Sequence, residues 1–277
     1  MNAPSKPKKA TWKNLGVRFV SAVVLVAICF APLMFGGLVW AVLVMLLGGR
    51  LMWEWVRMAD AAPSNLAFIV PIAGLIVGIL YVYMQSCGPA IITVVLTAAV
   101  AVAERSRRSG GLWSGLGFLY VAVPCLLIVL LRGNEPGLTS SGFLLLAFLI
   151  VIVGAADTGA YFGGSYFKGP RMAPKLSPKK TWSGFVSGFI MASIFGALAG
   201  LILGFSPQTG ALLAAPVIIF SVIGDFLESG LKRRLQVKDA GNLLPGHGGL
   251  LDRLDSLMMV VVVTAIALQV WPGLWPV

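Results

Sequence analysis

The chain has 277 residues, of which 58% are hydrophobic and 11% are charged. Soluble domains carry about 25% charged residues, so this composition excludes an ordinary water-soluble globular protein. The 21 Lys and Arg residues against 10 Asp and Glu residues give a formal net charge of +11. In such an apolar chain, this excess of positive charge must be confined to particular segments.

Apolar runs long enough to cross a membrane recur along the whole chain, and the mean hydropathy is +0.92. The sequence therefore predicts an all-α, polytopic membrane protein with about nine transmembrane helices. The lysines of residues 1–16 resemble the basic region of a signal peptide, but no A-x-A-like cleavage site closes the first apolar run, so we expect a retained first helix. The three cysteines lie in or beside apolar runs and are expected to act as small hydrophobic residues. The predicted spans cover residues 17–35, 36–57, 65–84, 88–103, 111–131, 141–162, 184–204, 209–230 and 256–274.

The distribution of basic residues predicts the orientation of these spans. If the N-terminus lies in the cytoplasm, every Lys and Arg except Arg132 falls on the cytoplasmic side, as the positive-inside rule requires. We expect a basic cytoplasmic segment over 1–16, an N-terminal bundle of about five helices over 17–140, and a C-terminal region over 141–277 that holds the functional site. This last region has two long cytoplasmic loops, over 163–183 and 231–255. They contain most of the Lys and Arg residues of the region, together with Gly and Pro residues.

Carboxylates stand near the inner ends of several predicted helices, where a charge is costly and usually marks a site. Asp157 lies at the inner end of the sixth span, and Asp225 lies toward the inner end of the eighth. The spacing of Asp225, Glu228, Ser229 and Lys232 places them on one helical face, and Asp252, Asp255 and Ser256 repeat the pattern. Two such faces directed at one polar pocket could hold Mg²⁺ together with substrate phosphates. The alternative is that the acids only pair with the neighbouring Arg233, Arg234 and Arg253.

A glycine-rich run over 245–249 lies between these two acidic faces. Glycines such as Gly248 and Gly249 let backbone N–H groups approach a phosphate closely, although ordinary loops contain such runs too. His247 is the only histidine, and no cysteine lies near it in the sequence to form a zinc site. We expect His247 to donate a hydrogen bond to a substrate phosphate rather than to act as a general base.

A basic run over 175–184 has the pattern of a helix start. Ser177 would cap the helix, Pro178 would take its first position, and Lys179 and Lys180 would gather at its N-terminus, where an anion is favoured. The alternative is an anchor beside anionic lipid headgroups. The two runs and the carboxylates together indicate a polyanion, either a nucleoside triphosphate or a phospholipid headgroup, bound with a divalent metal. No Walker-type or GxGxxG motif is present, which argues against the conventional nucleotide-binding folds.

The order of these residues resembles the signature of the bacterial phosphatidate cytidylyltransferases, also called CDP-diacylglycerol synthases. The resemblance rests on Ser229 to Arg233, Lys238 and Asp239, Leu244 to Asp255, and, upstream, Asp157 to Tyr161 and Ser177 to Gly184. It covers about the C-terminal half of the chain, and the first 140 residues match only as a hydrophobic bundle. One position departs from the family pattern, because an acidic or amide residue usually follows the tryptophan where this chain has Ser183.

The resemblance implies that the protein transfers the cytidylyl group of CTP to phosphatidate in the lipid bilayer, with release of pyrophosphate, and that it has no nucleic-acid partner. It implies Mg²⁺ as cofactor, held by Asp225 and Asp252, and leaves a monovalent cation and a homodimer open. The implied catalytic residues are Asp225, Asp252, Asp255 and Lys232, and the implied substrate-binding residues are Asp157, Lys179, Lys180, Thr181, Ser229, Arg233, His247, Gly248, Gly249 and Arg253. The expected location is the bacterial cytoplasmic (inner) membrane.

Two other functions are compatible with parts of the pattern. A CTP-dependent lipid-alcohol kinase would use similar groups but would transfer the terminal phosphoryl group and release CDP. An ion-coupled transporter would bind cations at Asp157 and Asp225, but it predicts polar residues on both sides of the membrane. The outer side of this chain is nearly uncharged, which favours the enzyme.

Overall fold

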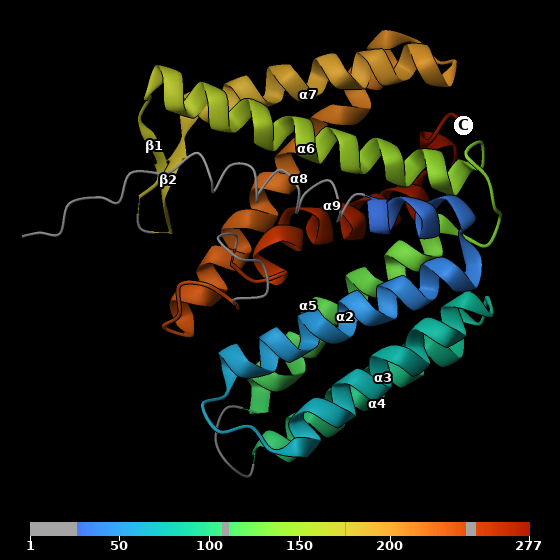
Figure 1. Cartoon of the computed structure of the whole chain (residues 1–277), viewed down its shortest axis with the longest axis vertical. Coiled ribbons are helices and arrows are strands. Elements are labelled where there is room, and N and C mark those ends of the chain that lie inside the picture. The colour runs from blue at the N-terminus through green and yellow to red at the C-terminus, as the bar shows by residue number, and fades with distance from the viewer. Residues whose placement is uncertain (1–26, 107–110, 175, 242–247) are drawn as a thin grey trace, which may run out of the picture.

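The computed structural model describes residues 27–106, 111–174, 176–241 and 248–277. Helices overlap all nine predicted apolar runs within this part of the chain, and eight of them are long and apolar enough to span a membrane. The prediction of an all-α polytopic membrane protein is therefore confirmed (Figure 1). The first run is helical over residues 27–35, and its earlier part, with the basic segment 1–16, lies outside the described residues. The long helices are α2 (Gly37–Ala59), α3 (Asn65–Tyr83), α4 (Cys87–Ser106), α5 (Gly111–Arg132), α6 (Ser141–Phe167), α7 (Trp182–Leu203), α8 (Pro207–Arg234) and α9 (Leu251–Val270).

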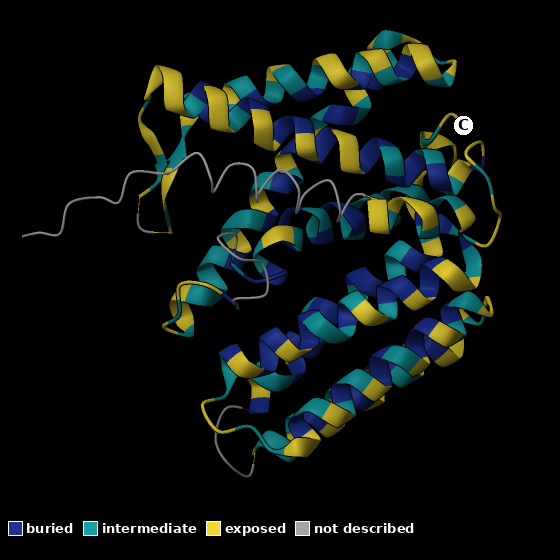
Figure 2. Cartoon of the chain, in the orientation of Figure 1, coloured by how far each residue is buried: buried dark blue, intermediate teal, exposed yellow. Residues whose placement is uncertain are grey.

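The first four of these helices form one packed group, and the last four form another. Helices α3 and α4 lie along one edge of the molecule, and α6 and α7 run side by side along the opposite edge (Figure 1). Helix α9 joins the groups, because it packs on α8 and also contacts α5 and α2. Helices α4 and α7 bury the smallest shares of their residues, so much of their apolar surface is left to lipid (Figure 2).

Glycines allow α6 and α7 to approach closely. A Cβ atom on Gly188 would lie 2.6 Å from the backbone oxygen of Ala156, and one on Gly159 would lie 2.8 Å from that of Ser187. Small residues at such contacts are the usual means of packing transmembrane helices, where no hydrophobic effect drives association. The close approach places Asp157 of α6 beside the first turns of α7.

One end of the bundle carries nearly all of the charge. We call it the basic end, and it is the end at which α2, α4, α6 and α8 finish and α3, α7 and α9 begin. Among the described residues, every Lys and Arg except Arg132 lies in the half of the bundle nearer this end, as the charge pattern predicts. Arg132, at the opposite end, is 1% exposed and donates hydrogen bonds to the backbone oxygens of Met34 (2.9 Å) and Glu135 (2.7 Å). Its role is therefore to join helix ends.

Three element boundaries at the basic end differ from the prediction. Helix α6 continues to Phe167, and α9 already begins at Leu251, so the polar segments that join the spans are shorter than 163–183 and 231–255. The predicted helix start at Ser177 is wrong, because Ser177–Thr181 forms strand β2, which pairs with β1 (Arg171–Ala173) in an antiparallel hairpin. Helix α7 starts only at Trp182, with Thr181 as its N-cap, whose side chain accepts a hydrogen bond from Gly184 N at 3.1 Å.

Candidate active site

A cavity of about 390 Å³ lies at the basic end, between α6, the β1–β2 hairpin, α7, α8 and α9. Its size falls within the range of small-molecule sites. Both acidic and basic side chains line it, which distinguishes it from the cavity near the opposite end of α9, beside Trp275, which no charged side chain lines. The sequence-predicted residues that line it are Asp157, Lys179, Lys180, Thr181, Asp225, Asp252, Arg253 and Asp255.

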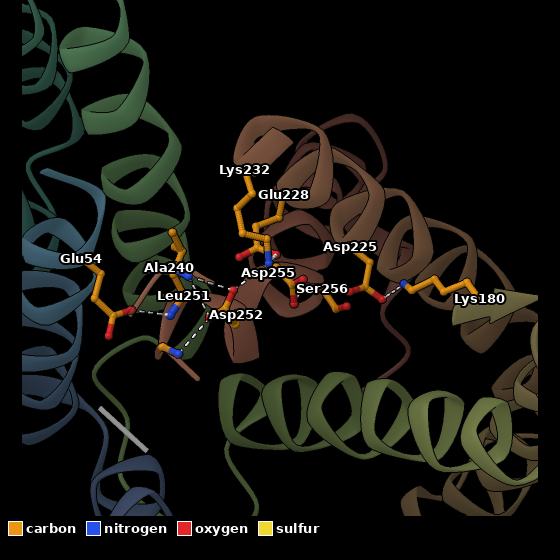
Figure 3. A network of polar contacts seen from close by, with 11 residues as sticks. Glu54, Lys180, Asp225, Glu228, Lys232, Ala240, Leu251, Asp252, Asp255 and Ser256 are labelled. Carbon is orange, nitrogen blue, oxygen red and sulfur yellow. Dashed lines mark hydrogen bonds and ion pairs between the residues drawn. The ribbon is translucent and has the colours of Figure 1, made fainter. Parts of the chain in front are cut away.

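Lys180 and Asp225 form an ion pair across this cavity (Figure 3). The hairpin carries Lys180, whose Nζ also lies 5.1 Å from the ring centroid of Phe226 on α8. Burial lowers the pKa of Lys180 to about 8, although the carboxylates of Asp255 and Asp157 partly offset this effect. The cavity therefore contains an ammonium group that is charged at neutral pH and loses its charge as the pH rises through about 8.

Asp252, in the first turn of α9, accepts hydrogen bonds from three donors (Figure 3). Lys232 Nζ lies 2.6 Å from Asp252 Oδ1, and the backbone N–H groups of Ala240 and Gly249 lie 3.0 and 2.8 Å from Oδ2. Lys232 also pairs with Glu228 Oε2 at 2.6 Å, one turn earlier on α8. This lysine thus connects the acidic face of α8 to that of α9.

Two further acids are buried where α8 meets α9. Glu228 is 2% exposed and Asp255 is 5% exposed. Asp255 Oδ1 accepts a hydrogen bond from Ser256 N at 2.7 Å, and Asp255 and Ser256 both line the cavity. Buried carboxylates require compensating partners, and Lys232 supplies one here.

The N-terminal edge of α7 is fixed by two hydroxyl groups. Ser183 Oγ accepts a hydrogen bond from Gly169 N at 3.0 Å and lies 3.1 Å from Thr181 Oγ1. Ser183 occupies the position where the resemblance leads us to expect an acidic or amide side chain. In this chain the residue closes the base of the β1–β2 hairpin, and it is not among the residues that line the cavity.

Four of the predicted substrate-binding residues that the structure describes do not line the cavity. Ser229 and Arg233 are on α8, and Arg233 is exposed. Gly248 and Gly249 immediately precede α9, and Gly248 has a φ of +86°, which favours glycine. His247 lies outside the described residues.

The structure adds Glu54, which the sequence analysis did not select. Glu54 belongs to α2 in the N-terminal group of helices, yet its carboxylate accepts hydrogen bonds from the backbone N–H groups of Leu250 and Leu251. Figure 3 shows the contact with Leu251. An acid within an apolar run, four residues after Arg50, is the only signal in the sequence that points to it. Its partners are about 200 residues away, so no local pattern could identify them.

Comparison with known proteins gives relatives over most of the chain. A protein of Brucella suis named phosphatidate cytidylyltransferase is 35% identical over 249 residues, covering 88% of this chain and 90% of that protein. Proteins with the same name from Pseudomonas aeruginosa and Staphylococcus aureus are 34% and 31% identical, covering 80% and 91% of this chain and 84% and 98% of their own lengths.

The model of the family described as "Cytidylyltransferase family" matches residues 16–271. This match includes the N-terminal helices, which the sequence resemblance reached only as a hydrophobic bundle. It also includes every residue that lines the cavity between α6, α7, α8 and α9. The chain therefore belongs to the cytidylyltransferase family.

Proposed function

We propose that this protein transfers the cytidylyl group of CTP to phosphatidate, forming CDP-diacylglycerol and pyrophosphate for phospholipid synthesis. The observation that carries the proposal is the identity of 31–35% to proteins named phosphatidate cytidylyltransferase over nearly their whole length. The cavity adds physical support, because it combines lysines for phosphates with carboxylates for a cation at one end of a membrane-spanning bundle.

In the proposed reaction, a phosphate oxygen of phosphatidate attacks the α-phosphorus of CTP. A new P–O bond forms, the bond between the α-phosphorus and the bridging oxygen breaks, and pyrophosphate leaves with that oxygen. The attacking oxygen is already an anion, so the reaction needs no strong general base. Orientation of the two phosphates and neutralisation of their charge should supply most of the rate.

The basic side chains have distinct places in this scheme. Lys179 and Lys180 reach the cavity from the hairpin, and Arg253 reaches it from the first turn of α9. Cations on two sides of one cavity suit two anionic substrates, one of them a triphosphate and the other a lipid phosphate. Lys232 is already engaged by Glu228 and Asp252, so we assign it to holding Asp252 in place in the absence of substrate.

The carboxylates fit Mg²⁺ as an ion that is bound largely through its substrates. No group of three or more Asp, Glu, His or Cys side chains converges as a ready metal site within residues 27–106, 111–174, 176–241 and 248–277. Mg²⁺ commonly takes one or two carboxylates plus substrate phosphates and water, which this cavity can provide. Asp225 and Asp252 would hold the ion, and Asp252 would then exchange its contact with Lys232 for the metal. When bound, Mg²⁺ would neutralise phosphate charge and polarise the P–O bonds.

The orientation and location follow from the charge distribution. The basic end would face the cytoplasm, where CTP is available, and the chain would lie in the bacterial cytoplasmic (inner) membrane. Phosphatidate would present its headgroup at this end while its acyl chains stay in the bilayer. A homodimer remains a prediction from the sequence.

The test is a labelled-substrate assay with purified protein in phosphatidate-containing nanodiscs, with Mg²⁺. CTP labelled on the α-phosphate should pass its label to lipid, and CTP labelled on the γ-phosphate should release it as pyrophosphate. Transfer of the γ-label to lipid, with CDP as product, would instead identify a lipid kinase. No transfer of either label, in protein shown to be folded, would refute the proposal.

A further inference from the structure

Glu54 is a fully buried carboxylate at the contact between the two groups of helices. Its exposed fraction is 0%, and it lies on α2, where this helix meets the start of α9. Oε1 accepts a hydrogen bond from Leu250 N at 3.1 Å, and Oε2 accepts one from Leu251 N at 2.9 Å. Arg50, one turn earlier on α2, pairs with Oε1 at 3.1 Å. A carboxylate removed from water in this way needs such donors, and each of them is in place.

These contacts make Glu54 the cap of a helix to which it does not belong. Three other helices are capped by the residue before their first turn, since Ser64, Thr181 and Ser206 each accept a hydrogen bond from the backbone N–H three residues later. Leu250 precedes α9 and has no side-chain oxygen to do this. Glu54 replaces the missing cap and also places a negative charge at the positive end of the α9 dipole.

The same stretch of backbone supports Asp252. Three successive N–H groups are held by two carboxylates, because Gly249 N donates to Asp252 and the next two N–H groups donate to Glu54. The position of Gly249 N helps to set the direction of the Asp252 carboxylate. Any shift of the chain at Leu250 would therefore be transmitted to Asp252, which lines the cavity.

Glycines on either side make room for Glu54. A Cβ atom on Gly241 would lie 2.7 Å from Glu54 Oε1, and one on Gly249 would lie 2.8 Å from Oε2. Contacts this short are not found for real Cβ atoms, so the backbone approaches the carboxylate more closely than any other residue type permits. At Gly249, then, the structure gives a steric reason for glycine that does not involve phosphate.

We infer that Glu54 is a positioning residue for the active site, which holds the first turn of α9 so that Asp252 faces the cavity. It does not touch the cavity itself and acts through the backbone of Leu250 and Leu251. The inference rests on the proposed function, because Asp252 is assigned to the site there. It gives the N-terminal helices a role in the reaction in addition to spanning the membrane.

The test compares Glu54→Gln with Glu104→Gln in purified protein. Glu104 is a matched control, because it lies on a helix of the same N-terminal group and accepts a hydrogen bond from Ser64 Oγ at 2.6 Å, near the basic end. Glutamine keeps the shape of glutamate but has one acceptor oxygen and no charge, so one of the two N–H groups loses its acceptor and the other keeps only a neutral one. We expect kcat to fall about tenfold to hundredfold in Glu54→Gln, the range for one hydrogen bond to a charged group, and to stay within twofold in Glu104→Gln.

Two measurements separate positioning from mere stability. The KM for CTP should stay within threefold in Glu54→Gln, because the lysines of the hairpin do not contact Glu54. Hydrogen exchange of peptides covering residues 248–256 should accelerate in this variant, while peptides from α7 should not change. A Glu54→Gln protein that has a lower Tm but the wild-type kcat, or unchanged exchange at 248–256, would overturn the inference.

Glu54→Asp covers the case in which Glu54→Gln does not fold. Aspartate keeps the charge but is shorter by one methylene, so it can satisfy only one of the two N–H groups, and kcat should fall about tenfold. Wild-type kcat in a folded Glu54→Asp protein would refute the inference. A wild-type protein that forms no CDP-diacylglycerol would refute the proposed function instead, and the exchange measurement would still report on the contact itself.

Discussion

Lys180 offers a direct test of how the cavity binds phosphate. Its ammonium group loses its proton near pH 8 in the free protein, whereas an arginine at the same position stays charged at any pH of interest. The pKa of Lys180 is lowered from its ordinary value of 10.5 to about 8. At about 1.36 kcal/mol per pKa unit, this difference corresponds to about 3 kcal/mol. This is the free energy by which burial disfavours the charged lysine, net of the attraction of Asp255 and Asp157.

The sign of the pH dependence follows from this lowered pKa. Below about pH 8 the lysine is charged and can bind a phosphate, and above it the charge is lost, so kcat/KM for CTP should decline tenfold per pH unit. Stability should change in the opposite direction. Between about pH 8 and 10.5 the unfolded chain keeps a proton that the folded protein has released, so this lysine makes the folded state more stable as pH rises.

The assay is the pH profile of kcat/KM for CTP in wild type, Lys180→Arg and Lys168→Arg. Ionisation of the substrates is common to all three proteins, so differences between the profiles report on the protein. Lys180→Arg should lose the decline above pH 8, whereas Lys168→Arg, changed at an exposed residue before the hairpin, should keep it. Identical profiles for wild type and Lys180→Arg would refute the assignment of Lys180 to phosphate binding.

Three other substitutions test separate parts of the structure. Asp225→Asn should reduce kcat/KM at least about a hundredfold with little change in Tm, because it removes a charge worth about 3 kcal/mol at the reacting phosphates. Full activity in this variant would contradict the place of Asp225 in the site. Arg132→Met should lower the free energy of unfolding by about 3 kcal/mol or more, measured by thermal denaturation in detergent, since it leaves buried backbone oxygens without donors far from the cavity. Thr181→Val should lower it by about 1 kcal/mol through loss of the α7 cap, and Thr181→Ser should restore most of this.

Within the described residues, hydropathy alone predicted where the long helices lie and their order along the chain. In lipid, the backbone N–H and C=O groups of a single segment can all be hydrogen-bonded only if the segment is a helix. Each apolar run therefore coincides with a helix through the membrane. The agreement ends at the polar ends of the helices. Helix α9 begins at Leu251, five residues before the predicted run, because helical hydrogen bonding continues through Asp252 and Asp255 although hydropathy does not.

The lysine hairpin shows why the local pattern was insufficient. Ser177 and Pro178 satisfy the rules for a helix start, but Ser177–Thr181 instead pairs with Arg171–Ala173 as a strand. A strand is stabilised by a partner elsewhere in the chain, which capping rules do not take into account. The error left the candidate residues unchanged, since Lys179, Lys180 and Thr181 line the cavity from the hairpin.

The acidic faces were predictable for the opposite reason. Helical spacing depends only on sequence separation, so Asp225, Glu228 and Lys232 share a face of α8 wherever that helix lies. The sequence could not show that Lys232 bridges to Asp252, 20 residues later, because this contact depends on how α8 and α9 cross. Glu54 is the extreme case, since it supports α9 from the other group of helices.

The pairing of charges in the free protein has a consequence for the proposed reaction. Lys180 pairs with Asp225, and Lys232 pairs with Asp252 as well as with Glu228. A divalent cation that binds the two carboxylates would release both lysines, and a triphosphate that binds the lysines would release both carboxylates. Binding of either ligand should therefore raise the affinity of the cavity for the other, and linkage requires the two affinities to rise by the same factor. If Asp225 and Asp252 hold Mg²⁺ as proposed, we expect the cavity to bind a metal-nucleotide complex more tightly than either component, because only the complex replaces every partner that it displaces.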